Sequence, residues 1–223
     1  MIVVHHLNHS RSQRVLWLLE ELGLDYELKL YQRDPQTMLA PSSLRAIHPL
    51  GKSPVITDGD LVIAESGAII EYLIGRYAPQ RLIPAADTPE RLRWTYWLHF
   101  AEGSAMTPLL LKLVFEKVAT SPMPFFARPI ARAIARKVSS SFIAPQIRQQ
   151  LDFMEGALAH SAWFAGDAFS AADIQMSFPL EAAQARGGLD ASYPRLTAFL
   201  ERIHARPAYQ RALVRGGPYA LLG

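Results

Sequence analysis

The chain of 223 residues contains no cysteine. This absence excludes disulfide bonds, metal sites with thiolate ligands and a catalytic thiol of the protein's own. Any thiol chemistry must therefore use a sulfur atom that a ligand supplies. The seven histidines show no spacing that would gather them on one face of a strand or helix, so we expect no metal.

The sequence also lacks an apolar run that approaches the ~20 residues of a membrane-spanning helix. Its start, MIVVHHLNHS, has neither a basic beginning nor a long apolar segment, and it predicts a β-strand rather than a signal peptide. Hydrophobic residues make up 50% of the chain and charged residues 19%, which is typical of a globular protein. We expect a cytoplasmic protein with no membrane span.

One long segment lacks acidic residues. Between Glu116 and Asp152 there are six basic residues and no acidic one. Residues 1–80 hold 7 Lys and Arg against 9 Asp and Glu, a balance of −2, and residues 81–223 hold 16 against 11, a balance of +5. Arg128, Arg132 and Arg136 are spaced to form one stripe on a helix. The pattern favours a solvated helix face over a surface for membranes or nucleic acid, and we expect no nucleic-acid partner.

Two short runs, IHPLGKSPVI at 47–56 and AESGAII at 64–70, carry the most informative local signals. Lys52-Ser53-Pro54 opens a predicted strand, and Asp58-Gly59 turns it back into a second strand at Leu61–Ala64. The proline begins a strand, and we predict a cis peptide bond before it. Glu65-Ser66 then starts an apolar-periodic helix, whose N-terminus can receive a carboxylate. Together these features predict a receptor for a small anionic peptide.

The rest of residues 1–80 predicts a parallel βαβ unit. Ile2–Leu7 is rich in β-branched residues, Arg14–Leu22 has the helical period and stops at Gly23, and Asp25–Tyr31 gives a second strand. A strand, a crossover helix and a further strand form a parallel pair. With the hairpin added, this part of the chain is a small mixed sheet with helices packed on it.

The proline-rich stretch from Pro79 to Pro89 is the predicted domain boundary. Everything after it predicts helices, interrupted by prolines between 122 and 129. Ser170 and Asp173 form a capping box at the start of a helix that contains Pro179, where we expect a kink. The other expected helices are Glu90–Leu113, Pro145–Leu158 and Tyr193–Arg206.

This order of motifs resembles the glutathione transferase family over nearly the whole chain, especially the branch typified by the yeast type I enzyme and its bacterial relatives. The resemblance rests on HHLNHSRSQRVLWLLEELGL at 5–24, on the Lys-Ser-Pro turn, on Glu65-Ser66, and on FSAADIQMSFPL at 169–180. It implies an α/β plus all-α protein. Residues 1–80 would form a thioredoxin-like, glutathione-binding domain, and residues 90–223 a helical bundle that carries the second-substrate site.

The resemblance also implies a catalytic donor in the turn after the first strand. A hydroxyl that donates to the sulfur of glutathione favours the thiolate, which is the nucleophile. Alignment of the helix start with serine-type transferases puts Ser10 at the position of the catalytic serine, with Asn8 as the second choice. Ser12 would then be a cap or a residue of the helix wall.

By the same resemblance, four positions would hold the peptide of glutathione. Lys52 pairs with a carboxylate, and Ser53, before the cis Pro54, bonds the cysteinyl backbone. Glu65 takes the ammonium group, and Ser66 takes the γ-glutamyl carboxylate. The family usually has Val or Ile where this chain has Ser53, which is compatible with a role played by the backbone.

The expected activity is attack of the glutathione thiolate on a hydrophobic electrophile or a hydroperoxide, with glutathione as the co-substrate. Met106 and Leu110 are the candidates for the wall of the electrophile site. A homodimer is expected, because the family pairs domains across subunits and because the Ser66–Tyr77 helix and the segment Trp94–Phe100 carry an apolar excess. The alternative is a binding module that resembles the family but has no catalytic role.

Overall fold

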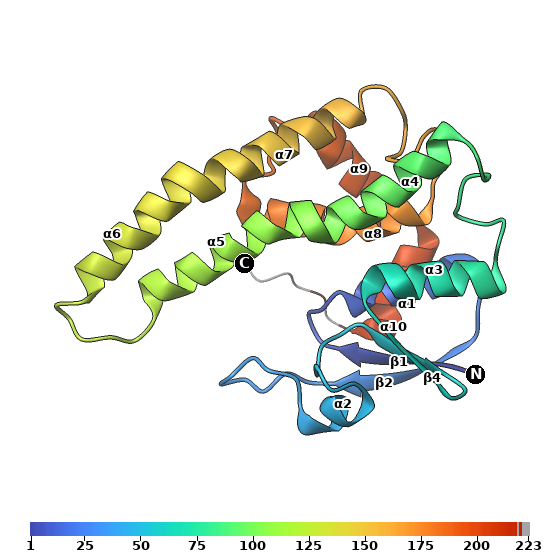
Figure 1. Ribbon diagram of the computed structural model, residues 1–223, viewed down its shortest axis with the longest axis horizontal. Helices are drawn as coiled ribbons and strands as arrows, with labels where there is room; N and C mark the ends of the chain where they lie inside the picture. Colours follow the sequence, from blue (N-terminus) through green and yellow to red (C-terminus); the bar gives the residue numbers. More distant parts are fainter. Residues whose placement is uncertain (218, 220–223) are drawn as a thin grey trace.

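A computed structural model describes residues 1–217 and 219, so the end of the predicted helical domain, at 218 and 220–223, lies outside the described residues. A mixed sheet with the strand order β2-β1-β3-β4 forms the N-terminal part (Figure 1). β1 pairs parallel with β2, while β3 runs antiparallel to both β1 and β4. The strands are β1 (Ile2–Leu7), β2 (Tyr26–Tyr31), β3 (Val55–Asp58) and β4 (Leu61–Ala64). The predicted βαβ unit and hairpin are thus confirmed, with β2 beginning one residue later than expected.

The helices of this part are α1 (Ser12–Leu22), α2 (Ser42–Ile47) and α3 (Ser66–Tyr77). α1 ends at Gly23, whose φ of 68° is a left-handed conformation that glycine adopts without steric cost. Nine of the eleven residues of α1 are buried, because one side of the helix packs on β1 and α3 while another contacts α8 and α10 of the C-terminal part. α1 is therefore the element that both parts of the protein share.

The C-terminal part is helical (Figure 1). The expected helix at Glu90–Leu113 is correct in its course but is interrupted by the π-helical segment η1, where the backbone widens for one turn. Another π-helical segment, η2, joins α6 to α7, so the predicted helix at Pro145–Leu158 continues a longer one. The segments are α4 (Pro89–Phe100), η1 (Ala101–Ala105), α5 (Met106–Thr120), α6 (Arg128–Val138), η2 (Ser139–Ile143), α7 (Ala144–Ala157), α8 (Ala171–Ala182), η3 (Ala183–Gly187), α9 (Pro194–His204) and α10 (Pro207–Gly216).

The predicted capping box is confirmed at the start of α8. The backbone N–H and the hydroxyl of Ser170 both donate to Oδ2 of Asp173, at 2.8 and 3.1 Å. Oδ1 of Asp173 accepts the backbone N–H of Phe164 at 2.9 Å, which ties the preceding loop to the helix. Every residue of α8, including the internal Pro179, is buried, so this helix is the centre of the C-terminal part.

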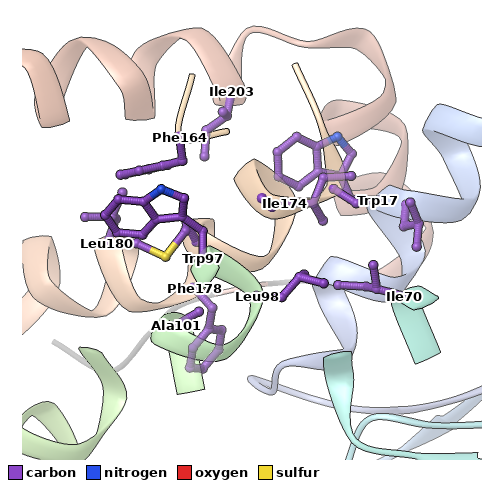
Figure 2. Packing of buried hydrophobic residues seen from close by; sticks show 14 of the residues in the cluster. Trp17, Ile70, Trp97, Leu98, Ala101, Phe164, Ile174, Phe178, Leu180 and Ile203 are labelled. Atoms are coloured by element: carbon purple, nitrogen blue, oxygen red, sulfur yellow. The ribbon is translucent and has the colours of Figure 1, made fainter. Parts of the chain in front are cut away.

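One hydrophobic core runs through both parts. Figure 2 shows Trp17 of α1, Ile174 of α8 and Trp97 of α4 within this cluster. Trp17 is fully buried and meets the ring of Tyr209 edge to face, with the ring centroids 5.1 Å apart. Tyr209 belongs to α10, a helix that the sequence analysis did not separate, and α10 returns from the C-terminal part to pack on α1.

Within the described residues, no helix is long and apolar enough to cross a membrane. The same residues contain no group of three or more His, Cys, Asp or Glu that could hold a metal ion.

Candidate functional site

Ser10 lies in the turn that joins β1 to α1, and it is 3% exposed. Its Oγ is 2.7 Å from the Oγ of Ser12 and 3.2 Å from the Oγ of Ser53. The backbone N–H of Ser12 also donates to the Ser10 oxygen, at 3.3 Å. The structure therefore brings together Ser10 and Ser53, two predicted site residues that are 43 positions apart in the sequence.

Ser12 extends this set of hydroxyls to a buried histidine, since its Oγ is 2.9 Å from Nδ1 of His6. Burial lowers the pKa of His6 to about 4, although a hydrogen bond to the backbone of Gly216 opposes the shift. The ring is therefore neutral at pH 7. A neutral imidazole has one N–H donor and one acceptor nitrogen, so the tautomer of His6 sets the direction of its bond with the Ser12 hydroxyl.

Ser12 is the first residue of α1 and is fully buried, as a residue of the helix wall would be. The alternative expectation, that it caps the helix, is wrong. Arg11 occupies the cap position, and its side chain makes no capping bond. The hydroxyl of Ser12 is instead committed to Ser10 and His6.

Asn8, the second candidate donor, lies at the beginning of the same turn. Its Oδ1 accepts the backbone N–H of Arg33 at 2.8 Å, and its backbone carbonyl accepts Nε of Arg33 at 3.3 Å. These bonds join the ends of β1 and β2. The carbonyl side of the Asn8 amide is thus structural, and its amide nitrogen is the part that could donate to a ligand.

The peptide bond between Ser53 and Pro54 is cis, as predicted. The hydroxyl of Ser53 donates to the backbone carbonyl of His5 at 3.3 Å, which fixes the turn against the end of β1. Pro54 is buried directly before β3, whereas the neighbouring Lys52 is exposed. The turn therefore presents a cation at the surface and a hydroxyl toward Ser10.

Glu65 and Ser66 form the start of α3, as predicted. Glu65 occupies the cap position with φ 72° and ψ 127°, a conformation that a residue with a side chain rarely adopts. Strain of this kind is found most often where a functional site fixes the backbone. Ser66 is 3% exposed, and its Oγ accepts a hydrogen bond from the guanidinium of Arg14 at 3.0 Å.

Arg14 is the residue that the sequence analysis missed. Its side chain is 1% exposed, so a full positive charge is buried between the two parts of the protein. One guanidinium nitrogen donates to the backbone carbonyl of Gln175 at 2.7 Å, and the other reaches both Ser66 and Oε1 of Glu102, the latter at 2.5 Å. Arg14 therefore links α1, the start of α3, α8 and the π-helical segment η1.

Glu102 is held by a second arginine as well, because Nε of Arg11 is 3.0 Å from its Oε2. Burial raises the pKa of Glu102, but the charges of Arg14 and Arg11 outweigh burial, and the net shift of the pKa is downward. Both guanidinium groups also lie over the ring of Phe178, at 5.2 and 5.0 Å from its centroid. Arg14 and Glu102 are 88 positions apart in the sequence, so no local pattern indicates this cluster.

The two candidates for the electrophile wall differ in exposure. Leu110 of α5 is 54% exposed, whereas Met106, one turn earlier, is 5% exposed and belongs to the core. Val114 and Val118 continue the exposed row of Leu110 along α5. A wall on this helix would therefore consist of Leu110 and the two valines, and Met106 would pack behind it in the core.

A separate aromatic hollow of about 790 Å³ opens between α4, α7 and the loop before α8. Tyr96, Trp97, Phe153 and Phe164 are among its lining residues. None of the predicted site residues lines it. Volume alone would favour this hollow as the functional site, but the clustered hydroxyls and charges lie at the junction of β1, α1 and α3.

Comparison with known proteins gives the family of this chain. The N-terminal domain of glutathione S-transferases matches residues 1–75, and their C-terminal domain matches residues 143–207. Glutathione S-transferase 3 of Schizosaccharomyces pombe is 36% identical over 208 residues, which are 93% of this chain and 85% of the relative. The chain belongs to the glutathione S-transferase family. Glutathione S-transferase 1 of Saccharomyces cerevisiae is a further relative, 35% identical over 94% of this chain and 92% of its own length.

Solved glutathione S-transferases share the fold along nearly the whole chain. The enzyme from Actinobacillus pleuropneumoniae superposes with a TM-score of 0.78 at 36% identity, covering 97% of this chain and 93% of its own. A sphingomonad glutathione S-transferase, solved in complex with glutathione, superposes with a TM-score of 0.72 at 25% identity over 96% and 98% of the two chains. The resemblance and the fold class predicted from the sequence are thereby confirmed.

Proposed function

We propose that this glutathione S-transferase binds glutathione at the junction of β1, α1 and α3 and activates its thiol through the Ser10 hydroxyl. The observation that carries the proposal is the 3.2 Å approach between the hydroxyls of Ser10 and Ser53. It joins the turn before the first helix to the cis-proline turn, which are the places where the family resemblance puts the sulfur and the cysteinyl backbone of the ligand.

The catalytic step begins with a thiol whose pKa is near 8.5, so that only a few per cent is ionised at pH 7. A hydroxyl of Ser10 that donates to the sulfur stabilises the thiolate relative to the thiol and lowers this pKa. The N-terminus of α1, which begins two residues later at Ser12, adds a favourable dipole. The thiolate then attacks the electrophilic carbon, forming the carbon–sulfur bond as the bond to the leaving group breaks.

Ser10 is the first candidate donor because its hydroxyl already faces the cis-proline turn. Turning toward a sulfur atom would require it to give up its present contact with Ser12 or Ser53. Asn8 is the second candidate, through the nitrogen of its amide. We assign the catalytic role to Ser10 and keep Asn8 as the alternative that the variants described below distinguish.

The remaining roles concern binding. Exposed Lys52 would pair with a carboxylate of glutathione, and the backbone of Ser53, before Pro54, would bond the cysteinyl residue in the manner of an added strand. Glu65 would take the ammonium group of the γ-glutamyl residue. Ser66 would take its carboxylate, with the charge of Arg14 directly behind the Ser66 hydroxyl.

The second substrate is a hydrophobic electrophile, for which the exposed apolar row that begins at Leu110 offers the wall, supported by Met106. A hydroperoxide is the other acceptor class. The thiolate would attack the outer oxygen as the O–O bond breaks, giving the sulfenic acid of glutathione and an alkoxide, which takes up the proton released when the thiol ionised and becomes the alcohol. A second glutathione would convert this acid to the disulfide and water. In both cases the proposed role is detoxification in the cytoplasm, where thiols are kept reduced.

Turnover of the purified protein tests the activity. Glutathione would be offered with a panel of aryl halides, hydroperoxides and mixed disulfides, and the Ser10→Ala variant would serve as the matched control. Turnover that depends on Ser10 supports the proposal. Glutathione binding without turnover of any acceptor would favour the alternative, a binding module without a catalytic role.

A homodimer is the proposed assembly. Leu92 and Tyr96 lie one turn apart on α4 and are 74% and 46% exposed, and Phe153 of α7, whose ring meets that of Tyr96, is 48% exposed. A second copy that covers this aromatic surface would bury rings that the monomer leaves in water. Sedimentation velocity at micromolar concentration should give the mass of a dimer, and a monomeric mass would contradict the proposal.

A further inference from the structure

The helices α5 and α6 form a hairpin that projects beyond the rest of the molecule, with its connecting loop at the far left end of Figure 1. Two phenylalanines occupy this loop, and Phe125 and Phe126 are 81% and 66% exposed. Their rings meet edge to face, with the centroids 5.7 Å apart. The most prominent point of the protein is thus an unburied aromatic pair.

The exposed apolar surface continues from the loop along α6. Ile130 and Ile134 are 62% and 52% exposed, and their spacing of four residues places them on one face of the helix. Ala135 is the only buried residue of α6. The helix therefore turns Ala135 and Val138 toward the protein and leaves its two isoleucines in solvent, which is unusual for a surface helix of a globular protein.

The basic stripe found in the sequence lies on another face of the same helix. Arg128, Arg132 and Arg136 are all exposed, and no ion pair joins any of them to a carboxylate within residues 1–217 and 219. Lys137 follows the stripe directly, and no acidic residue occurs between Glu116 and Asp152. Glu116, the acidic residue that α5 contributes to the hairpin, is paired with Lys112, so the basic stripe of α6 is left without compensating charge there.

We propose that the α5–α6 hairpin docks on an anionic lipid bilayer. In this arrangement the phenyl rings of the loop and the isoleucines of α6 enter the boundary between headgroups and acyl chains. The arginines remain at the level of the lipid phosphates, which guanidinium groups bind well. The hairpin lies on the membrane and does not cross it, in agreement with the absence of a spanning helix in the described chain.

Charge decides between this occupant and a second copy of the chain. A two-fold contact centred on the hairpin would bring α6 against the α6 of the second copy, so that one row of arginines would meet an equally basic surface. Like charges at an interface oppose association. An anionic bilayer instead satisfies the apolar rings and the cations together, and its attraction to basic residues adds up along the helix.

Co-sedimentation of the full-length protein with vesicles tests the proposal. The probes are phosphatidylcholine vesicles with and without phosphatidylglycerol, at low and high salt. Binding should require phosphatidylglycerol and should weaken as salt rises, because the Debye length falls from about 10 Å at 0.1 M to about 3 Å at 1 M. Failure to bind anionic vesicles at low salt would overturn the proposal.

Variants separate the two contributions. The triple change Arg128→Gln, Arg132→Gln and Arg136→Gln should weaken binding by about 100-fold, at roughly fivefold for each arginine. Phe125→Ser with Phe126→Ser should weaken it by about tenfold or more. All five side chains are exposed, so circular dichroism and thermal unfolding should match the parent.

The matched control removes the same number of charges elsewhere, through Lys29→Gln, Arg45→Gln and Arg195→Gln, and should bind nearly as the parent does. If the control loses as much vesicle binding as the arginine variant, or if the phenylalanine variant loses none, the binding reflects only a general attraction by net charge. Either result would overturn the proposed docking. Self-association that depends on Phe125 and Phe126, without vesicle binding, would make a second copy the occupant.

Discussion

The two ends of the proposed glutathione site are built from different chemistry. At the sulfur end, Ser10, Ser12, Ser53 and a neutral His6 form a set of uncharged hydrogen-bonding groups. At the γ-glutamyl end, Ser66 is attached to a cluster in which the charges of Arg14, Arg11 and Glu102 meet. Both ends present a serine hydroxyl, but only one of these hydroxyls rests on buried charge.

The difference in charge between the two ends suits them to different roles. An uncharged end lets Ser10 redirect its one proton to a new partner at little electrostatic cost, as thiolate activation requires. The charged end has no such freedom, because separating Arg14 from Glu102 would leave a buried charge without compensation. We therefore expect variants of the sulfur end to change catalysis and variants of the other end to change stability and affinity.

The largest effect should come from Glu102→Gln. This change leaves the buried Arg14 without a carboxylate partner, so that only uncharged groups such as the Gln175 carbonyl and the Ser66 hydroxyl face it, and it should lower the free energy of unfolding by about 3–5 kcal/mol. Chemical denaturation of the parent and the variant measures this loss. Glu90→Gln is the control, because its exposed pair with Arg93 should contribute less than about 1 kcal/mol. Equal losses in both variants would mean that the buried cluster does not join the two parts.

Ser10→Ala should act on catalysis rather than on stability. Loss of a charge-assisted hydrogen bond of about 1.5–3 kcal/mol should raise the pKa of the bound thiol and lower kcat/KM at neutral pH by about 10–100-fold. Glutathione affinity should change little, and the loss of rate should shrink as pH rises. Measured kcat/KM against pH, with the ultraviolet absorbance of the thiolate, tests this.

Asn8→Ala and Ser12→Ala accompany Ser10→Ala as controls. Ser12→Ala removes the middle of the hydroxyl set but leaves the Ser10 donor in place, so it should cost stability and keep most of the pH profile. If Asn8→Ala shifts the apparent pKa and Ser10→Ala does not, the catalytic donor is Asn8.

Acid should weaken the sulfur end selectively. The unfolded chain takes up a proton on His6 near pH 6.5, whereas the folded chain does so only near pH 4. Stability should therefore fall as pH drops from about 7 to 5, by about 2 kcal/mol from this group. His6→Asn keeps an uncharged group beside Ser12 and should remove this part of the loss in urea denaturation at the two pH values. An unchanged pH dependence in the variant would show that His6 does not contribute.

Ser66→Ala should have the smallest effect. Its hydroxyl is proposed to meet the γ-glutamyl carboxylate, so glutathione affinity in calorimetric titration should fall about tenfold, which corresponds to about 1.4 kcal/mol. Stability should fall by about 1 kcal/mol, because Arg14 keeps its other partners. Thr88→Ala removes the cap of α4 at a similar cost in stability, and it should leave the affinity unchanged. An unchanged affinity in Ser66→Ala would reject its assignment.

The sequence predicted the features that depend on neighbours in the chain. The hairpin at Asp58-Gly59, the cis bond before Pro54 and the capping box at Ser170 follow from local conformational preferences, and all three are present. The turn that holds Ser10 and the helix start at Ser66 followed from the predicted elements, whereas the choice of Ser10 as the donor followed from the family resemblance. Local pattern also gave the split between the α/β part and the helical part.

What the sequence could not predict depends on contacts between distant segments. Arg14 has the spacing of a residue in an ordinary amphipathic helix, and only the folded chain brings Glu102 beside it. The π-helical segment that carries Glu102 has no distinct periodicity, since it differs from an α-helix by one wider turn. The contact between the Ser12 hydroxyl and His6 likewise arises from the way α1 lies against β1. Ser12 makes this contact instead of capping the helix, which was one of the two roles expected from its position.

The return of α10 to α1 has a consequence for synthesis on the ribosome. Trp17 is covered by Tyr209, which is translated 192 residues later. At a rate of about 5–20 residues per second, the helix beside the proposed catalytic serine remains without its outer cover for roughly 10–40 s. The half of the chain that holds the proposed glutathione site, although made first, is therefore among the last parts of the protein to be completed.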